Sequence, residues 1–162
     1  MSEAKKNDRE KNYLDYIRNW CALQERCAQE IKDKLVSLNS KLNQEQISEI
    51  ISQLEKENYL SEQRFAMAYG SGKFRIKKWG KIKIRMMLKQ KRIADSIIRT
   101  ALENINESEY TSVLRKILEE KKRKLKAEKN PILLNHKLIR FAQSRGYETD
   151  IIMDCLKTLN DD

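Results

Sequence analysis

An apolar pattern that occurs three times constrains the fold of this chain more than any other feature. Counted from an anchor residue, apolar side chains recur at offsets of 0, 4, 5, 8 and 9, with one polar exception in the first copy. The anchors Leu42, Ile93 and Tyr147 are 51 and 54 residues apart. These spacings place side chains on one face of a helix, and an even period of this length predicts tandem repeats. The members are Leu42, Gln46, Ile47, Ile50 and Ile51; Ile93, Ile97, Ile98, Ala101 and Leu102; and Tyr147, Ile151, Ile152, Cys155 and Leu156.

Each copy of the pattern follows an amphipathic helix, and another helix precedes that one. The chain is rich in Leu, Ile, Lys, Glu and Gln and has only four Gly and one Pro, a composition typical of helical proteins. We therefore predict an all-α fold of three tandem three-helix repeats. Such units stack in a row, so the expected shape is an elongated, curved rod. The predicted units are a frayed tail at residues 1–8 and repeats at residues 9–58, 59–106 and 107–162.

Several residues mark the expected helix ends. Asn43 and Ser61 are predicted N-caps, and the helix that Ser61 opens is expected to run into the glycine-containing segment 70–72. Pro131 suits a helix start and Gly146 a helix stop. The segment between Trp20 and Cys27 contains no Gly or Pro, so the sequence shows no break there.

The positive charge is concentrated in residues 64–92, here called the basic window. No carboxylate lies between Glu62 and Asp95, and since the net charge is +10, the rest of the chain carries about −1. A focused positive surface attracts a polyanion, most often nucleic acid. A solvated lysine-rich helix face is the alternative, but eleven like charges without counter-ions repel one another, so we favour a polyanionic partner. The eleven are Arg64, Lys73, Arg75, Lys77, Lys78, Lys81, Lys83, Arg85, Lys89, Lys91 and Arg92.

One helix of the basic window has an apolar side and a charged side. Basic residues at i, i+4, i+8 and i+11 form a stripe that faces away from Ile84 and Leu88. We predict that this stripe, its neighbours and a second cluster bind the polyanion, although cations near a helix C-terminus also suit the helix dipole. The candidates are Lys81, Arg85, Lys89 and Arg92 in the stripe, Lys73, Arg75, Lys77 and Lys78 before it, and Lys121, Lys122, Arg123, Lys124 and Lys126 in the second cluster.

Three aromatic residues, Tyr69, Phe74 and Trp79, are interleaved with these cations. An aromatic ring beside lysines could stack on a nucleic-acid base. The alternative is that the rings pack in the core of the middle repeat, and for Trp79 we favour the core.

The sequence contains no recognisable catalytic pattern. His136 is the only histidine, and Cys21, Cys27 and Cys155 have neither metal-ligand spacing nor a paired histidine. The glycines at 70–72 are too few for a phosphate loop, and the carboxylates are not clustered as in a metal-dependent nuclease. We expect no enzyme, no cofactor and no metal site.

The cysteines and the apolar runs also predict a location. An odd number of cysteines and an N-terminus without an apolar leader favour a reducing compartment. The apolar runs are far shorter than the roughly 20 residues that span a bilayer. We therefore expect a soluble, cytoplasmic protein.

Three motifs in this order resemble the RecX family of regulatory proteins, and the likeness covers residues 21–159. They are residues 59–66 (YLSEQRFA), residues 78–93 (KWGKIKIRMMLKQKRI), and residues 137–141 (KLIRF) followed by 145–147 (RGY). This chain has Ser61-Glu62 where the family often has an Asp-Asp pair. Cys27 stands where the family usually has a serine that caps a helix, and Arg92 where it usually has a glycine.

The resemblance implies three tandem three-helix repeats and a function without catalysis. RecX-like proteins lie in the groove of the RecA filament on single-stranded DNA, where they block extension or promote disassembly. They thereby lower strand exchange, ATP hydrolysis and co-protease activity. The implied partners are the RecA filament and single-stranded DNA, with double-stranded DNA as a further candidate and no membrane, and we expect a monomer.

Two other interpretations stay open at this point. The first is a helical nucleic-acid-binding protein that acts alone, through the helix at residues 81–92. Its exposed stripe is nearly all Lys and Arg, which suits phosphates better than base edges. The second is an adaptor that binds an acidic protein, which charge alone does not distinguish from a DNA-binding protein.

Overall fold

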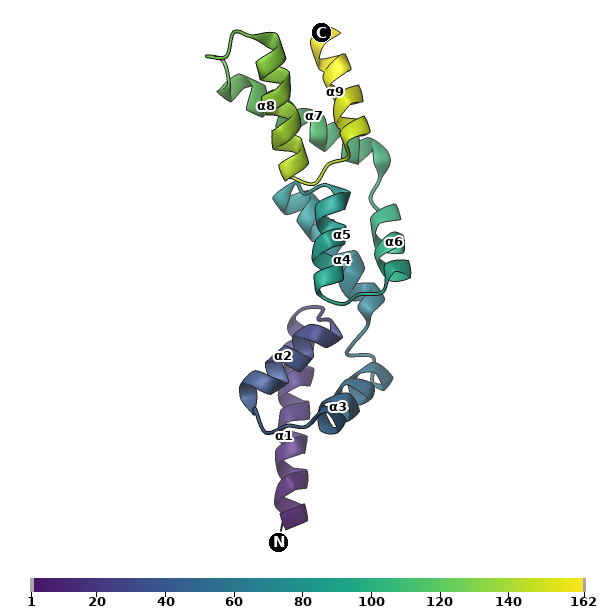
Figure 1. Cartoon of the computed structure of the whole chain (residues 1–162). Helices are drawn as coiled ribbons and strands as arrows, with labels where there is room; N and C mark the ends of the chain where they lie inside the picture. Colours follow the sequence, from purple (N-terminus) through teal and green to yellow (C-terminus); the bar gives the residue numbers. More distant parts are fainter. Residues whose placement is uncertain (1, 162) are drawn as a thin grey trace.

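The computed structural model describes the backbone of residues 2–161 and the side-chain surroundings of residues 12–159. Over this part of the chain it contains α-helices and no strand. The helices are α1 (Ser2–Leu23), α2 (Ala28–Leu38), α3 (Gln44–Lys56), α4 (Glu62–Lys77), α5 (Lys81–Gln90), α6 (Asp95–Glu103), α7 (Glu107–Lys124), α8 (Pro131–Ser144) and α9 (Thr149–Asp161). Three successive groups of three helices form an elongated, curved rod with the two chain ends far apart (Figure 1).

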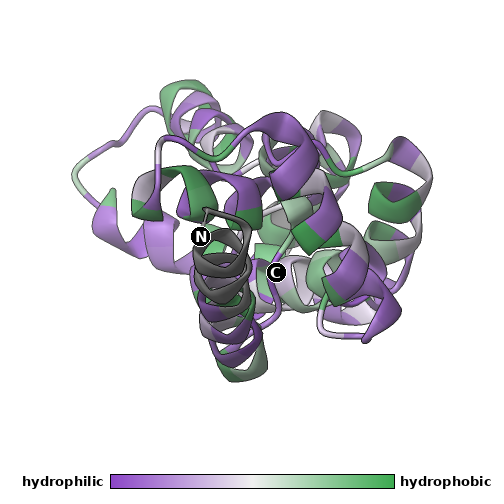
Figure 2. Cartoon of the chain, turned by 90° about the horizontal axis from the view of Figure 1, so that it is seen from below, coloured by the Kyte–Doolittle hydropathy of each residue, from purple (hydrophilic) through white to green (hydrophobic). Residues whose placement is uncertain are grey.

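This architecture confirms the predicted all-α fold of three tandem three-helix repeats. The boundaries at 9–58, 59–106 and 107–162 stay a prediction. We call α1–α3, α4–α6 and α7–α9 the first, second and third repeats. Seen along the rod, hydrophilic and hydrophobic segments alternate along the helices, as in amphipathic helices (Figure 2).

The repeated apolar pattern lies in the core, as expected. Ile98 and Ile152 are fully buried, and Ile47 is nearly so. One buried cluster fills the first repeat, whereas a second cluster runs continuously through the second and third repeats. The second and third repeats therefore share an apolar core, and the first repeat has its own.

The predicted caps at Asn43 and Ser61 are confirmed. Asn43 forms a capping box with Gln46, because the Asn43 side chain accepts from the Gln46 amide at 2.8 Å and the Gln46 side chain accepts from the Asn43 amide at 3.1 Å. The Ser61 hydroxyl accepts from the Arg64 amide at 3.3 Å. Pro131 opens α8 as predicted, after the N-cap Asn130.

One predicted helix end was wrong. α4 continues through the glycines to Lys77, because Gly70 is buried against α5, where an added Cβ would lie 3.7 Å from Ile84. α1 begins at Ser2, and the frayed tail at residues 1–8 stays a prediction. The described residues do not include Met1.

A helix break that the sequence did not show separates α1 from α2 at residues 24–27. The Arg26 guanidinium lies 4.1 Å from the centre of the Trp20 ring. Cys27 makes no side-chain cap bond and is buried in the cluster that fills the second and third repeats. The break therefore coincides with a tertiary contact of Cys27 that the local sequence does not show.

Candidate polyanion-binding surface

The helix that carries the basic stripe, α5, is held against the third repeat by two glycines. The Gly80 amide donates to the Arg145 carbonyl at 2.8 Å, and the Ile82 amide donates to the Gly146 carbonyl at 3.0 Å. A Cβ on Gly80 would lie 2.2 Å from the Gly146 carbonyl oxygen, and Gly146 itself has a φ of +89°. Only glycine permits this approach of the two backbones, so the pair fixes α5 relative to the third repeat.

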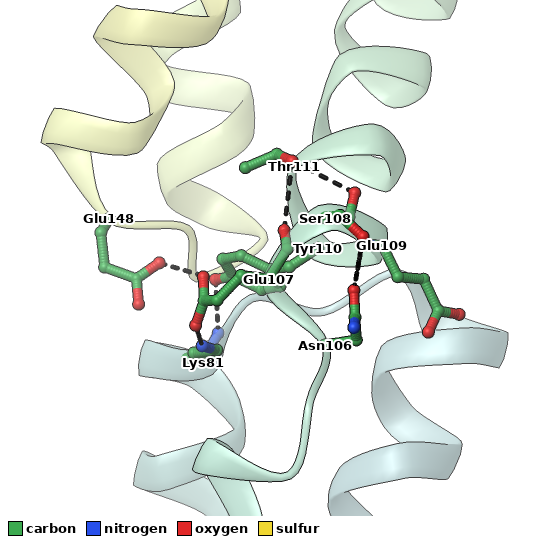
Figure 3. Close-up of polar contacts among 8 residues, drawn as sticks. All are labelled: Lys81, Asn106, Glu107, Ser108, Glu109, Tyr110, Thr111 and Glu148. Atoms are coloured by element: carbon green, nitrogen blue, oxygen red, sulfur yellow. Dashed lines mark hydrogen bonds and ion pairs between the residues drawn. The ribbon is translucent and has the colours of Figure 1, made fainter.

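Tyr110 joins the same two repeats through its hydroxyl group (Figure 3). The buried hydroxyl accepts from the Lys81 amide at 2.8 Å and donates to the Glu148 carboxylate at 2.6 Å. Burial, followed by the hydrogen bond to Glu148, raises the pKa of Tyr110 well above its ordinary value. The hydroxyl therefore stays protonated and supplies both bonds.

The first member of the predicted stripe belongs to this joint rather than to the free surface. The Lys81 ammonium pairs with Glu107 and lies 4.9 Å from the centre of the Tyr110 ring. The Lys81 side chain is only 16% exposed. Asn106, the N-cap of α7, holds the start of that helix by accepting from the Glu109 amide at 3.0 Å. Lys81 thus has an internal counter-ion, and we regard it as a positioning residue for α5.

Carboxylates from outside the basic window form ion pairs with five of its eleven cations. This corrects the expectation that the cluster has no internal counter-ion. The partners come from the first repeat, from the start of α6 and from the start of α7. The pairs are Arg64 with Glu25 at 2.8 Å, Lys91 with Glu30 at 2.6 Å, Lys89 with Asp95 at 3.2 Å, Arg75 with Glu109 at 3.6 Å, and Lys81 with Glu107.

The cations that remain accessible lie on α5 and around its two ends. Arg85 and Arg92 are exposed, and neither has an ion-pair partner among residues 12–159. Lys77 and Lys78 are exposed at the turn that precedes α5, where the Lys78 ammonium donates to the Arg75 carbonyl at 2.6 Å. The structure therefore brings together a smaller positive surface than the sequence predicts, and Lys89 borders it with a partly exposed side chain.

Trp79 packs against the shared core, in agreement with the core interpretation. The ammonium groups of Lys73 and Lys83 lie 5.2 Å and 4.8 Å from the centre of its ring. Phe74 is buried, and the ring of Tyr69 lies 5.2 Å from the Lys73 ammonium. The rings of Trp79 and Tyr69 thus hold lysines in place.

The second predicted cluster, at the end of α7, is divided between packing and solvent. The Lys121 ammonium lies 5.1 Å from the centre of the Phe141 ring, and the Lys122 ammonium donates to the Leu159 carbonyl at 3.4 Å. Arg123, Lys124 and Lys126 are exposed. These three are the part of the cluster that can meet a partner.

Two apolar residues that the sequence analysis did not single out lie on α5 beside these cations. Ile82 is 52% exposed and Met86 is 50% exposed. They are one turn apart, and Met86 directly follows Arg85 in the chain. Their spacing is the signal that could have found them, because Ile84 and Leu88 already define the buried side of α5 and leave Ile82 and Met86 off it. The surface is therefore both cationic and apolar.

The described part of the chain contains no group of three or more His, Cys, Asp or Glu side chains that could hold a metal ion. Within residues 2–161, none of the helices combines the length and the apolar character that crossing a membrane requires. Burial raises the pKa of all three cysteine thiols, which opposes the reactive thiolate form.

Comparison with known proteins identifies the repeats. Residues 61–102 match the model of the second three-helix domain of RecX, and residues 107–156 match that of the third. The regulatory protein RecX of Chlorobaculum tepidum is 30% identical over 157 residues, which cover 97% of this chain and 91% of that protein. The RecX of Bacillus mycoides is also 30% identical, over 94% of this chain, but this chain spans only 55% of the length of that relative.

Solved structures agree on the fold. A crystal structure of RecX from Lactobacillus salivarius has a TM-score of 0.84 at 22% identity, covering 95% of this chain and 98% of that one. A second crystal structure, of a regulatory protein RecX, has a TM-score of 0.81 at 18% identity, covering 91% of this chain and 73% of that one. Together with the near full-length match to the Chlorobaculum relative, these findings show that this chain belongs to the RecX family of regulatory proteins.

Proposed function

We propose that this protein is a non-catalytic regulator of homologous recombination and DNA repair. It binds the RecA filament on single-stranded DNA and lowers strand exchange, ATP hydrolysis and co-protease activity. The observation that carries the proposal is the match to a RecX protein along 97% of this chain. The elongated, curved rod supports it, because such a shape can follow a helical groove (Figure 1).

The surface on α5 supports a contact with the filament. Arg85, Lys89 and Arg92 offer charge for phosphates or acidic side chains, while Ile82 and Met86 offer an apolar contact area for protein. We include the remaining predicted cations, above all Arg123, Lys124 and Lys126, as an extension of this surface. The protein acts as a monomer in this proposal.

The test is RecA-catalysed ATP hydrolysis on single-stranded DNA with increasing amounts of this protein. An Arg85→Glu/Lys89→Glu variant is compared with an Arg140→Glu/Lys116→Glu control, which makes the same change in charge at exposed helix positions of the third repeat. We expect the parent and the control to inhibit. The α5 variant should need about tenfold more protein, equivalent to roughly 1.4 kcal/mol of binding free energy.

Three results would contradict parts of the proposal. If the parent does not inhibit a cognate RecA, the proposed function is wrong. If both variants inhibit like the parent, the α5 surface is not the contact. If the protein binds single-stranded DNA equally well without RecA, with a salt slope of about −0.7 per phosphate contact, the independent nucleic-acid-binding interpretation gains support.

A further inference from the structure

A groove lies between the first and second repeats and meets the α5 surface at Lys77. It has a volume of about 550 Å³ and is bounded by the α1–α2 connection, α2, α4 and α5. One face of α4 forms most of its floor, because the residues involved recur at three- and four-residue steps. The residues of this face that carry the argument are Ala68, Tyr69, Gly72, Lys73, Ile76 and Lys77.

This face of α4 is open where a buried helix face would be covered. Ile76 is 77% exposed, although an isoleucine on a helix normally packs against a neighbour. A Cβ on Gly72 would meet no atom within 4 Å, and Ala68, one turn earlier, is also exposed. Two small residues one turn apart lower the floor of the groove enough for another backbone to approach closely.

Charge on the rim of the groove is positive and partly uncompensated. Lys73 and Lys77 have no carboxylate partner among residues 12–159. Two acidic residues also line the groove, but Glu25 pairs with Arg64 outside it and Glu30 pairs with Lys91. Lys73 is held in place by aromatic contacts, since its ammonium lies 5.2 Å from the centre of the Tyr69 ring.

We propose that this groove docks an acidic amphipathic helix of a partner protein. An apolar side chain of that helix sits over Gly72, between Tyr69 and Ile76, and its carboxylates pair with Lys73 and Lys77. This is helix-in-groove recognition, in which apolar anchors supply affinity and charge supplies orientation. The proposal concerns the α4 face of this groove, which shares Lys77 with the positive surface around α5, and it does not require that the partner be RecA.

A helix fits the groove better than the alternatives do. Single-stranded nucleic acid binds by stacking bases on open aromatic faces, but the Tyr69 ring already has the ammonium groups of Lys73 and Lys91 within 5.2 Å and 5.7 Å of its centre. An exposed isoleucine at the rim suits an aliphatic or aromatic side chain instead. A second copy of this chain is disfavoured, because the chain carries a net charge of +10.

The test is an NMR titration of the ¹⁵N-labelled full chain with a capped peptide of Leu, Glu and Ala, about 15 residues long so that it can form a helix. Its leucines lie on one face. We expect shift changes to concentrate on residues 68–77, with smaller ones at Met87 and Lys91. A matched peptide with Lys in place of Glu, at the same concentrations, should produce none of these changes.

Variants locate the binding site. Gly72→Leu places a large side chain in the groove and should weaken binding of the Leu/Glu peptide by about tenfold or more. Gly72→Ala adds only a methyl group and should keep most of the peptide binding. Lys73→Glu/Lys77→Glu should abolish the preference for the Leu/Glu peptide over the Leu/Lys peptide. Far-ultraviolet circular dichroism establishes that each variant is folded.

Three outcomes would overturn the proposal. One is unchanged peptide binding by the folded Gly72→Leu variant, and another is shift changes that lie on α5 instead of α4. The third is an oligothymidylate that shifts residues 68–77 and displaces the peptide, because nucleic acid would then be the occupant. RecA is absent from this experiment, so its failure leaves the proposed function untouched.

Discussion

Replacing Gly80 by alanine should separate the second and third repeats. The φ of −77° at Gly80 suits alanine, so any cost comes from contact and not from backbone strain. The new Cβ would lie 2.2 Å from the Gly146 carbonyl oxygen and 2.4 Å from the Tyr147 amide nitrogen. Carbon atoms make ordinary contacts at about 3.5–4.0 Å, so the two backbone segments would have to move apart by more than roughly 1 Å.

That movement breaks the two backbone hydrogen bonds of the joint, from Gly80 to Arg145 at 2.8 Å and from Ile82 to Gly146 at 3.0 Å. Each bond contributes about 1 kcal/mol, and buried groups left without partners add to the loss. Alanine also restricts the conformations of the unfolded chain, which offsets the loss of stability by roughly 0.5 kcal/mol. We therefore expect the free energy of unfolding to fall by about 2–3 kcal/mol, a large part of the 5–15 kcal/mol typical of a domain.

The assay is equilibrium urea denaturation followed by circular dichroism, with Gly72→Ala as the matched control. An added Cβ at Gly72 meets nothing within 4 Å, and alanine favours a helix interior. The control should therefore gain about 0.5–1 kcal/mol. If Gly80→Ala is as stable as Gly72→Ala within about 0.5 kcal/mol, the close approach of the two backbones does not hold the repeats together.

Three further changes test other contacts. Tyr110→Phe should lower the free energy of unfolding in urea by about 1–3 kcal/mol, because the amide of Lys81 loses its acceptor; no loss would contradict this. Arg92→Gly should raise it by about 1 kcal/mol, since Arg92 has a φ of 60°, where side chains are strained; a loss would refute the strain. Hydrogen bonds from Arg18 lower the pKa of Glu57, so the stability from this pair is present above the unfolded pKa of about 4.3 and is lost as pH falls below it. Arg18→Met should lose less stability than the parent between pH of about 5 and 3. Identical pH profiles of the two proteins would exclude this pair as a source of the pH-dependent stability.

The sequence determined the helices and their grouping, because helical periodicity is a property of neighbouring residues. The offsets of the repeated pattern predicted that Ile98 and Ile152 are buried, and both are fully so. Asn43 and Ser61 were predictable as caps since a cap bonds to a backbone amide only three residues away. The family resemblance was also present in these local motifs, and the comparisons bear it out.

Only the tertiary structure decided which cations remain free. Lys91 pairs with Glu30 across 61 positions of sequence, and Lys81 with Glu107 across 26, so neither pair is visible in a local pattern. The basic window therefore has no counter-ions in its own stretch of sequence. The packing of the repeats brings carboxylates from other segments next to its cations. The same packing leaves Ile76 exposed and Gly72 open on α4. Helix formation depends on near neighbours, whereas an accessible surface depends on where every other repeat lies.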